Sequence, residues 1–420
     1  MTNAVPPREQ RIPVPEPDLT RDMLIDRARA LRDRIREEQD SSEKRGCHSP
    51  ELEQEFVKAG FYRILQPRMF GGYEFDYVTF YRVMLEICRG NPGTGWCVTL
   101  GASHAPVVAA LWPEEAQAEI FPADGHFVAP HRAGIPVPVK KVDGGYLVEG
   151  VWGYASGCPY STHFIGTAVV ENPGDGPESI TFIVPRDRYD ILDDWGGDNV
   201  LGMRASGSNS VRVQETVVPE HHVIPSAPGL WSAADISNGT YGTRLHGNPM
   251  YLARLMGPYH CSLVVPAIGA ARAAIDEMEG IARARKTRFP PVTAWYENSD
   301  VQRNFGQAIM LTDAAEAMLI RASEMYMEKC QRWAEDGTDF SVEESARMWG
   351  MLQYAGNMAC DAVDTMFRAA SSSAARTGQK MERYYRDAAM YRSHTSSQIP
   401  TFAGGIGRLA FGLKMDMFGV

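Results

Sequence analysis

A single histidine near the end of the chain lies in a segment that holds no carboxylate. From Ala388 to Met415 the sequence contains neither Asp nor Glu, and His394 is the one side chain there that exchanges a proton near neutral pH. Two charged pairs, Glu382-Arg383 and Arg386-Asp387, precede it at helical spacing, and a polar turn follows. An isolated imidazole after a helix indicates a proton donor or acceptor at a site without a carboxylate base.

Two glycine-containing segments in the middle of the chain carry serine hydroxyl groups. Ser156 lies in Gly150-Val-Trp-Gly-Tyr-Ala-Ser-Gly-Cys158, near an expected strand end, where a serine commonly bonds to backbone. Ser206 and Ser208 flank a glycine, which suits either a hairpin turn or the close approach of a ligand to the backbone. His131 precedes Ser156 by 25 residues in a loop-like segment, where surface histidines are common. Each of these residues has a structural interpretation beside a chemical one.

Three blocks of secondary structure position these side chains. Residues 1–122 begin with an extended, proline-rich leader and continue as helices, the first capped by Asp18 or Thr20. Residues 123–228 carry short β-rich runs that predict an antiparallel barrel or sandwich: Tyr146–Trp152, Phe164–Val170, Ile180–Val184 and Val211–Val217. Residues 229–420 are helical again. The sequence therefore predicts an α+β protein of three domains.

The third block contains a helix with a seam of small and large apolar residues. Its members lie alternately three and four residues apart: Ala308, Leu311, Ala315, Met318, Ala322 and Met325. Alanine at half of these positions lets a neighbouring helix come close, which predicts a tight helical bundle. We interpret the seam as core packing.

Composition limits the classes of partner. The chain has 420 residues, with 42 Lys and Arg against 52 Asp and Glu, so its net charge of −10 disfavours general binding to nucleic acid. Seven scattered cysteines without a C-x-x-C pair suit reduced thiols in the cytosol. No apolar run approaches the roughly 20 residues of a membrane-spanning helix. We expect a cytoplasmic protein.

Two apparent motifs do not indicate a binding site. His221-His222 has no second pair at metal-ligand spacing, so we predict a surface loop and no metal site. Gly405-Ile-Gly407-Arg-Leu-Ala410 fits a dinucleotide-binding pattern, but it follows a helical region and leaves ten residues before the end. Such a site needs a βαβ unit of about 30 residues. The sequence thus offers no nicotinamide site of the usual kind.

Four segments together resemble the flavin-dependent monooxygenases of the acyl-CoA dehydrogenase superfamily. The segment around His394 resembles the superfamily's active-site turn, where a glutamate usually removes an α-proton and which lacks one here. Gly150–Cys158 resembles the G-x-W-x-x-x-S-G-C segment of the oxygenase components of 4-hydroxyphenylacetate 3-hydroxylase and of steroid-degrading phenol hydroxylases. Ala129–Gly134 and Gly202–Ser208 match in the same order, so the similarity spans roughly residues 20 to 400. Pro159-Tyr160 departs from the family pattern, so we expect the local substrate contacts to differ.

The resemblance implies a chemistry and a set of roles. Dissociable reduced FMN or FAD reacts with O2 to give a C4a-hydroperoxyflavin, which hydroxylates a small aromatic such as a phenol. His394 is expected at the peroxide, Ser156 near flavin N5, and His131 at the substrate hydroxyl. Contacts to the cofactor are expected from Trp96, Trp152, Ser156, Ser206, Ser208 and Arg285. The resemblance also implies a homotetramer, with Arg285 near flavin phosphate across an interface, and an NAD(P)H:flavin reductase as partner.

Other functions remain open at this point. An N- or S-oxygenase of the same fold would differ only in the shape of its pocket. Acyl-CoA dehydrogenation is disfavoured because the stretch between Glu220 and Asp276 holds only Asp235, and the His394 turn holds no carboxylate. A non-catalytic flavin or ligand carrier would not need His131, Ser156 and His394 together.

Overall fold

The computed structural model describes residues 11–121, 125–174, 176–226, 230–232, 234–394 and 397–415, without the side chains of residues 133–136. Most of the predicted leader lies outside these residues. Within them, no helix is long and apolar enough to cross a membrane. The seven cysteines are all buried and free, as expected for reduced thiols.

The first part of the chain is helical, as predicted. It comprises α1 (Arg21–Glu37), α2 (Gln39–Arg45), α3 (Pro50–Ala59), α4 (Tyr77–Gly90), α5 (Pro92–Ala102), α6 (Ala105–Leu111) and α7 (Glu114–Ile120). Of the two predicted caps for α1, Thr20 performs this function, since its side chain accepts a hydrogen bond from the Met23 backbone N–H. Asn91 caps α5 in the same way and Pro92 occupies its first turn, so the start of this helix is fixed by sequence.

A seven-stranded sheet follows, with the order β5-β6-β2-β1-β3-β4-β7. The strands are β1 (His131–Val142), β2 (Gly145–Trp152), β3 (His163–Val170), β4 (Ser179–Pro185), β5 (Tyr189–Ile191), β6 (Val211–Pro219) and β7 (Val223–Pro225). All four predicted runs are strands. The sheet is mixed rather than purely antiparallel, because β3 pairs with β1 in parallel while the other pairs are antiparallel. The hairpin β1–β2 leads the chain back, so β3 runs along the free edge of β1 in the same direction.

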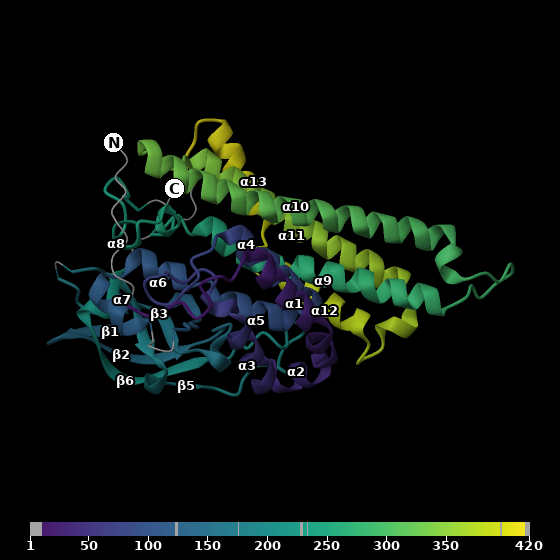
Figure 1. The fold of residues 1–420 in the computed structure, drawn as a ribbon, viewed down its shortest axis with the longest axis horizontal. Coiled ribbons are helices and arrows are strands. Elements are labelled where there is room, and N and C mark those ends of the chain that lie inside the picture. Colours follow the sequence, from purple (N-terminus) through teal and green to yellow (C-terminus); the bar gives the residue numbers. More distant parts are fainter. Residues whose placement is uncertain are drawn as a thin grey trace.

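The last part is a helical bundle. Its helices are α8 (Tyr241–His246), α9 (Met256–Ala284), α10 (Ser299–Asp336), α11 (Val342–Ala369), α12 (Lys380–Arg392) and α13 (Ile399–Ala410). The long helices α9, α10 and α11 lie side by side along the long axis, and the sheet lies toward one end of the molecule (Figure 1). Helix α13 contains the glycine motif of residues 405–410, which therefore does not form a phosphate-binding turn after a strand.

The buried face of α10 includes the alanines of the predicted seam, but its larger residues are less buried than predicted. Ala308, Ala315 and Ala322 are fully buried, whereas the leucine and the two methionines of the seam are only partly buried. Thr312, Leu319 and Tyr326 complete the buried face instead. Helix α10 packs against both α9 and α11, so its buried face is wider than one seam.

Two glycines bring α5 and α9 against the C-terminal end of α4. A Cβ on Gly95 of α5 would lie 2.2 Å from Cys88 Sγ, and a Cβ on Gly269 of α9 would lie 2.2 Å from Cys88 Cβ. No side chain larger than hydrogen fits at either contact. This close packing fixes the position of α5, and with it the side chain of Trp96.

Candidate active site

Three serines and a tryptophan form a chain of hydrogen bonds between α5 and the loops of the sheet. The indole Nε1–H of Trp96 donates to Ser156 Oγ at 3.0 Å. Ser156 Oγ lies 2.7 Å from Ser208 Oγ, which in turn lies 2.6 Å from Ser206 Oγ. Ser206 and Ser208 are buried, whereas Ser156 is partly exposed. Ser156 is therefore the end of this hydrogen-bonded chain that a ligand can reach.

A glycine beside Ser156 makes this arrangement possible. Gly157 has a φ of +88°, which side chains rarely adopt, and a Cβ there would lie 2.8 Å from the carbonyl oxygen of Cys97 on α5. Its backbone N–H donates to the Gly207 carbonyl at 3.0 Å. The turn after β2 and the loop that carries Ser206 and Ser208 are therefore held together against α5.

His394 lies just after the end of α12 and contacts the same tryptophan, Trp96. Its imidazole contacts the Trp96 ring edge to face, with ring centroids 5.7 Å apart. Burial, and secondly the positive charge of Arg132, lower the pKa of His394 to about 4. The imidazole is consequently neutral at pH 7 and offers one N–H donor and one acceptor.

The site residue predicted at the substrate lies in a neighbouring aromatic cluster. The His131 ring is 5.0 Å from Trp231 and 5.6 Å from His104, measured between ring centroids. Its Nε2 atom is buried and has no hydrogen-bond partner. Burial, followed by the charges of His104 and Arg132, holds the pKa of His131 well below its usual range. His131 is therefore a neutral imidazole with an unused polar atom.

His104 is a member of this cluster that sequence reasoning missed. It follows α5 directly, its Nδ1 lies 2.8 Å from the Ala129 carbonyl oxygen, and burial lowers its pKa to about 4. Trp96 and His104 lie eight residues apart on and just beyond α5, which corresponds to a rise of about 12 Å. The pairing of Ala129 with His104 could not be predicted from the sequence, because the two residues meet only when the segment before β1 packs against the end of α5, where the Ala129 N–H donates to the Gly101 carbonyl.

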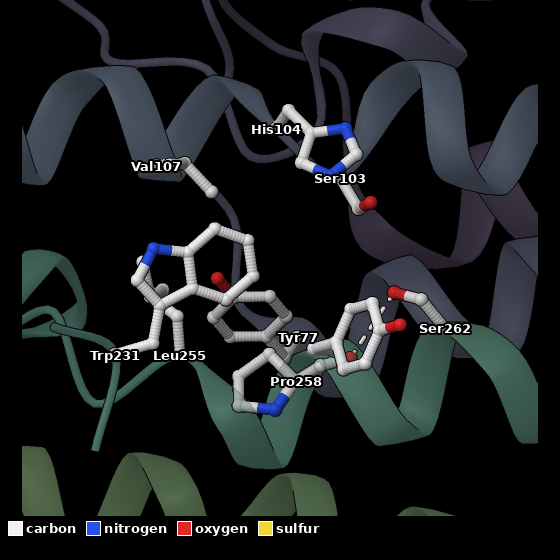
Figure 2. A pocket seen from close by; sticks show the side chains of 9 residues that line it. Tyr77, Ser103, His104, Val107, Trp231, Leu255, Pro258 and Ser262 are labelled. Carbon is white, nitrogen blue, oxygen red and sulfur yellow. Dashed lines mark hydrogen bonds between the residues drawn. The ribbon is translucent and has the colours of Figure 1, made fainter. Parts of the chain in front are cut away.

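A small cavity adjoins the aromatic cluster. It is lined by Tyr77, Ser103, His104, Val107, Trp231, Leu255, Pro258, Tyr259 and Ser262. Ser103 and His104 lie on one side of it, and Trp231, Leu255 and Pro258 lie on the other (Figure 2). Its free space accommodates little more than a water molecule. Movement of a lining side chain such as Trp231 is needed before an aromatic ring can enter.

Both helical parts of the chain match known domain families. Residues 19–123 match the N-terminal domain of acyl-CoA dehydrogenases, and residues 261–399 match a C-terminal domain of the same enzymes. The two segments together cover more than half of the chain. This chain belongs to the acyl-CoA dehydrogenase family.

Its relatives within this family include monooxygenases. A pigment production hydroxylase from a Rhodococcus strain is 28% identical over 95% of this chain and 99% of its own length. The oxygenase subunit HsaA of a flavin-dependent monooxygenase from Rhodococcus jostii is 28% identical over 81% of this chain and 85% of its own length. The crystal structure of 3-HSA hydroxylase from Rhodococcus sp. RHA1 superposes with a TM-score of 0.83 at 25% identity and covers 96% of this chain and 100% of that one. The resemblance drawn from the four sequence segments is confirmed.

Two residues expected at the flavin are placed elsewhere in this member of the acyl-CoA dehydrogenase family. Trp152 is buried in the core of the sheet between Phe164 and Phe182, and its Nε1–H donates to the Thr167 carbonyl at 3.0 Å. Arg285 lies at the end of α9, where it donates to Ala370 O and stacks on Trp295. Neither side chain is hydrogen-bonded to the serines, so the predicted contacts of Trp152 and Arg285 with the flavin remain predictions.

The remaining polar groups fit a flavin. Ser156 presents a partly exposed hydroxyl beside the indole of Trp96, and this indole contacts the imidazole of His394. A planar heterocycle with nitrogen and oxygen atoms along its edge needs these donors and aromatic surfaces.

Proposed function

We propose that this chain is the oxygenase component of a two-component monooxygenase that uses reduced FMN or FAD and O2 to hydroxylate a small aromatic, with phenols as the preferred substrates. The observation that carries the proposal is the contact of Trp96 with both Ser156 and His394, which joins three segments far apart in the sequence at one point. Reduced flavin, when bound, supplies the electrons that activate O2 for transfer of one oxygen atom.

Ser156 and His394 act as hydrogen-bond donors at the flavin. The Trp96 N–H donates to Ser156 Oγ, so the Ser156 hydroxyl proton can turn either to Ser208 or to an acceptor on the flavin. His394 is neutral at pH 7 because its pKa is lowered to about 4. It therefore stabilises negative charge through its N–H group rather than as an imidazolium. Burial around both residues keeps water away and strengthens these bonds.

His131 orients the substrate. Its buried Nε2 atom has no partner, and a phenolic hydroxyl can donate to it. Since the pKa of His131 lies well below its usual range, we assign it to holding this hydroxyl and polarising it toward phenolate. His104, Trp231 and Tyr259 supply the aromatic walls that a flat ring needs.

The proposal includes partners and an assembly. An NAD(P)H:flavin reductase delivers the reduced flavin, and the oxygenase works in the cytoplasm as a homotetramer. The tetramer gives Arg285 a role, because this arginine, held against Ala370 and Trp295 at the end of α9, contacts the flavin phosphate of a neighbouring subunit. Light scattering should then give a solution mass of about four times 46.5 kDa. A monomer that still binds flavin contradicts the assembly.

A titration of the purified chain under anaerobic conditions tests the function. We expect reduced FMN or FAD to bind more tightly than the oxidised form, and addition of O2 with a phenol to give a hydroxylated product. The control is the same mixture without protein, which forms only H2O2. A tightly bound flavin that NADH or an acyl-CoA reduces directly contradicts the two-component proposal.

A further inference from the structure

Three potential metal ligands converge on the surface, away from the serines and the aromatic cluster. Glu119 lies on α7, and His221 and His222 lie on the short 3-10 helix Glu220–His222 that precedes β7. Glu119 Oε2 is 3.1 Å from His221 Nε2 and 3.0 Å from His222 Nε2. Among the described residues, this is the group of His, Cys, Asp and Glu atoms that lies close enough together to share one ion.

The distances are close to those between ligands of one metal ion, as well as to those of hydrogen bonds. Ligands about 2.0 to 2.1 Å from a tetrahedral zinc ion lie about 3.3 Å from one another. The His221 contact has hydrogen-bond geometry, but the His222 Nε2 atom is buried and lacks a partner with such geometry. A cation between the three atoms would satisfy both nitrogens and the shared carboxylate oxygen at once.

A second carboxylate, Glu115, lies one helical turn before Glu119 on α7. The nearby cation Lys141 is paired with Glu220.

We propose that Glu119, His221 and His222 form a site for a divalent transition metal of the zinc type. The pair His221-His222 alone predicted a surface loop, because the third ligand comes from a helix about 100 residues earlier. The metal joins α7 to the segment before β7, and so links the first helical part of the chain to the sheet. Its three protein ligands and partial exposure leave a further position for water or for Glu115.

Zinc titration of the chain without an affinity tag tests the site. After dialysis against a chelator, we expect one equivalent of Zn²⁺ to bind in competition with a chromophoric chelator. Glu119→Gln and His221→Ala should each weaken this binding about 10-fold or more. Co²⁺ should give the visible absorption of a tetrahedral site in the parent chain and lose it in both variants. Zinc should also raise the melting temperature of the parent chain.

The matched control is Glu51→Gln, which removes an exposed glutamate from α3 in the same helical part. It should bind zinc like the parent chain. Circular dichroism checks that all variants fold, and a flavin titration separates this proposal from the proposed oxygenase function, since the metal variants should bind reduced flavin normally. Absence of a stoichiometric zinc site in the parent chain, or equal zinc affinity in the Glu119 and Glu51 variants, would overturn the proposal.

Discussion

Asp387 accepts a hydrogen bond from the backbone N–H of Met203 at 2.6 Å. The carboxylate belongs to α12, the helix that leads to His394, and Met203 begins the loop that carries Ser206 and Ser208. The preceding Gly202 lies so close to α12 that a Cβ there would be 2.1 Å from the Arg386 carbonyl oxygen. This one contact therefore fixes the distance between two parts of the candidate site.

Replacement of Asp387 tests this link. Burial, and then the charge of Glu43, raise the pKa of Asp387 to about 7, so a neutral amide resembles the side chain at neutral pH. Asp387→Asn should keep the acceptor oxygen and most of the stability. Asp387→Ala leaves a buried N–H unpaired, which should lower the free energy of unfolding by about 1 to 3 kcal/mol and weaken reduced-flavin binding. Denaturant unfolding and flavin titration measure both effects. Equal losses in the two variants would argue against a hydrogen-bonding role.

Loss of His394 should reduce oxygen transfer without unfolding the chain. The His394→Ala variant lacks the N–H next to Trp96, and removal of one such electrostatic contact costs about 10²- to 10³-fold in rate. Product formation from reduced flavin, O2 and a phenol is the measurement. The His394→Gln variant retains an N–H donor and should recover part of the rate. A His394→Ala variant with the parent rate would remove this residue from the mechanism.

Replacement of His131 should separate flavin chemistry from substrate binding. We expect His131→Ala to consume O2 at nearly the parent rate but to release more H2O2 and less product, because the phenolic hydroxyl has lost its acceptor. His104→Ala, in the same cluster, should raise the KM for the phenol with a smaller loss of coupling. The ratio of product to O2 consumed distinguishes the two variants. An unchanged ratio in His131→Ala would place the substrate elsewhere.

Stability should fall as the pH drops below 6.5. Burial lowers the pKa to about 4 in four histidines: His104, His163, His246 and His394. Between pH 6.5 and 4 the unfolded chain therefore binds protons that the folded chain does not, which favours unfolding. Asp387 acts in the opposite direction, because its raised pKa makes the folded chain bind a proton between pH 7 and 4. Burial also lowers the pKa values of His131 and His260, so the free energy of unfolding measured in urea should fall by several kcal/mol between pH 7.5 and 5.5. A stability that rises over this range would contradict these pKa shifts.

Local sequence patterns predicted the elements of the fold well. The four runs with β propensity are strands, and Thr20 caps α1, because period-two alternation and capping residues act over a few neighbours. The parallel pairing of β1 and β3 was missed, since the pairing partner of a strand depends on the course of the whole chain. The buried face of α10 was shifted for a related reason, because two neighbouring helices determine it.

The residues of the candidate site were predicted through the resemblance to a known family. Ser156, Ser206, Ser208, Trp96 and His394 meet in one place, and nothing in their local sequence requires this. Trp152 satisfies the same motif but lies in the core of the sheet. No sequence pattern marked His104 or Glu119 as a functional residue. His104 meets its neighbours only when a segment about 25 residues away packs against it, and Glu119 only when a segment about 100 residues away does so.

The hydrogen bonds among the three serine hydroxyls can point in either of two directions. Trp96 can only donate to Ser156, whereas each serine can rotate its proton toward either neighbour. In one orientation Ser156 donates inward to Ser208, and the chain offers no proton at its open end. In the other, Ser206 donates to Ser208, Ser208 donates to Ser156, and the Ser156 proton points out toward a ligand. An acceptor arriving at Ser156 therefore reverses both serine–serine bonds together, and Ser206, at the buried end of the chain of hydroxyls, takes part in whether that reversal is favourable.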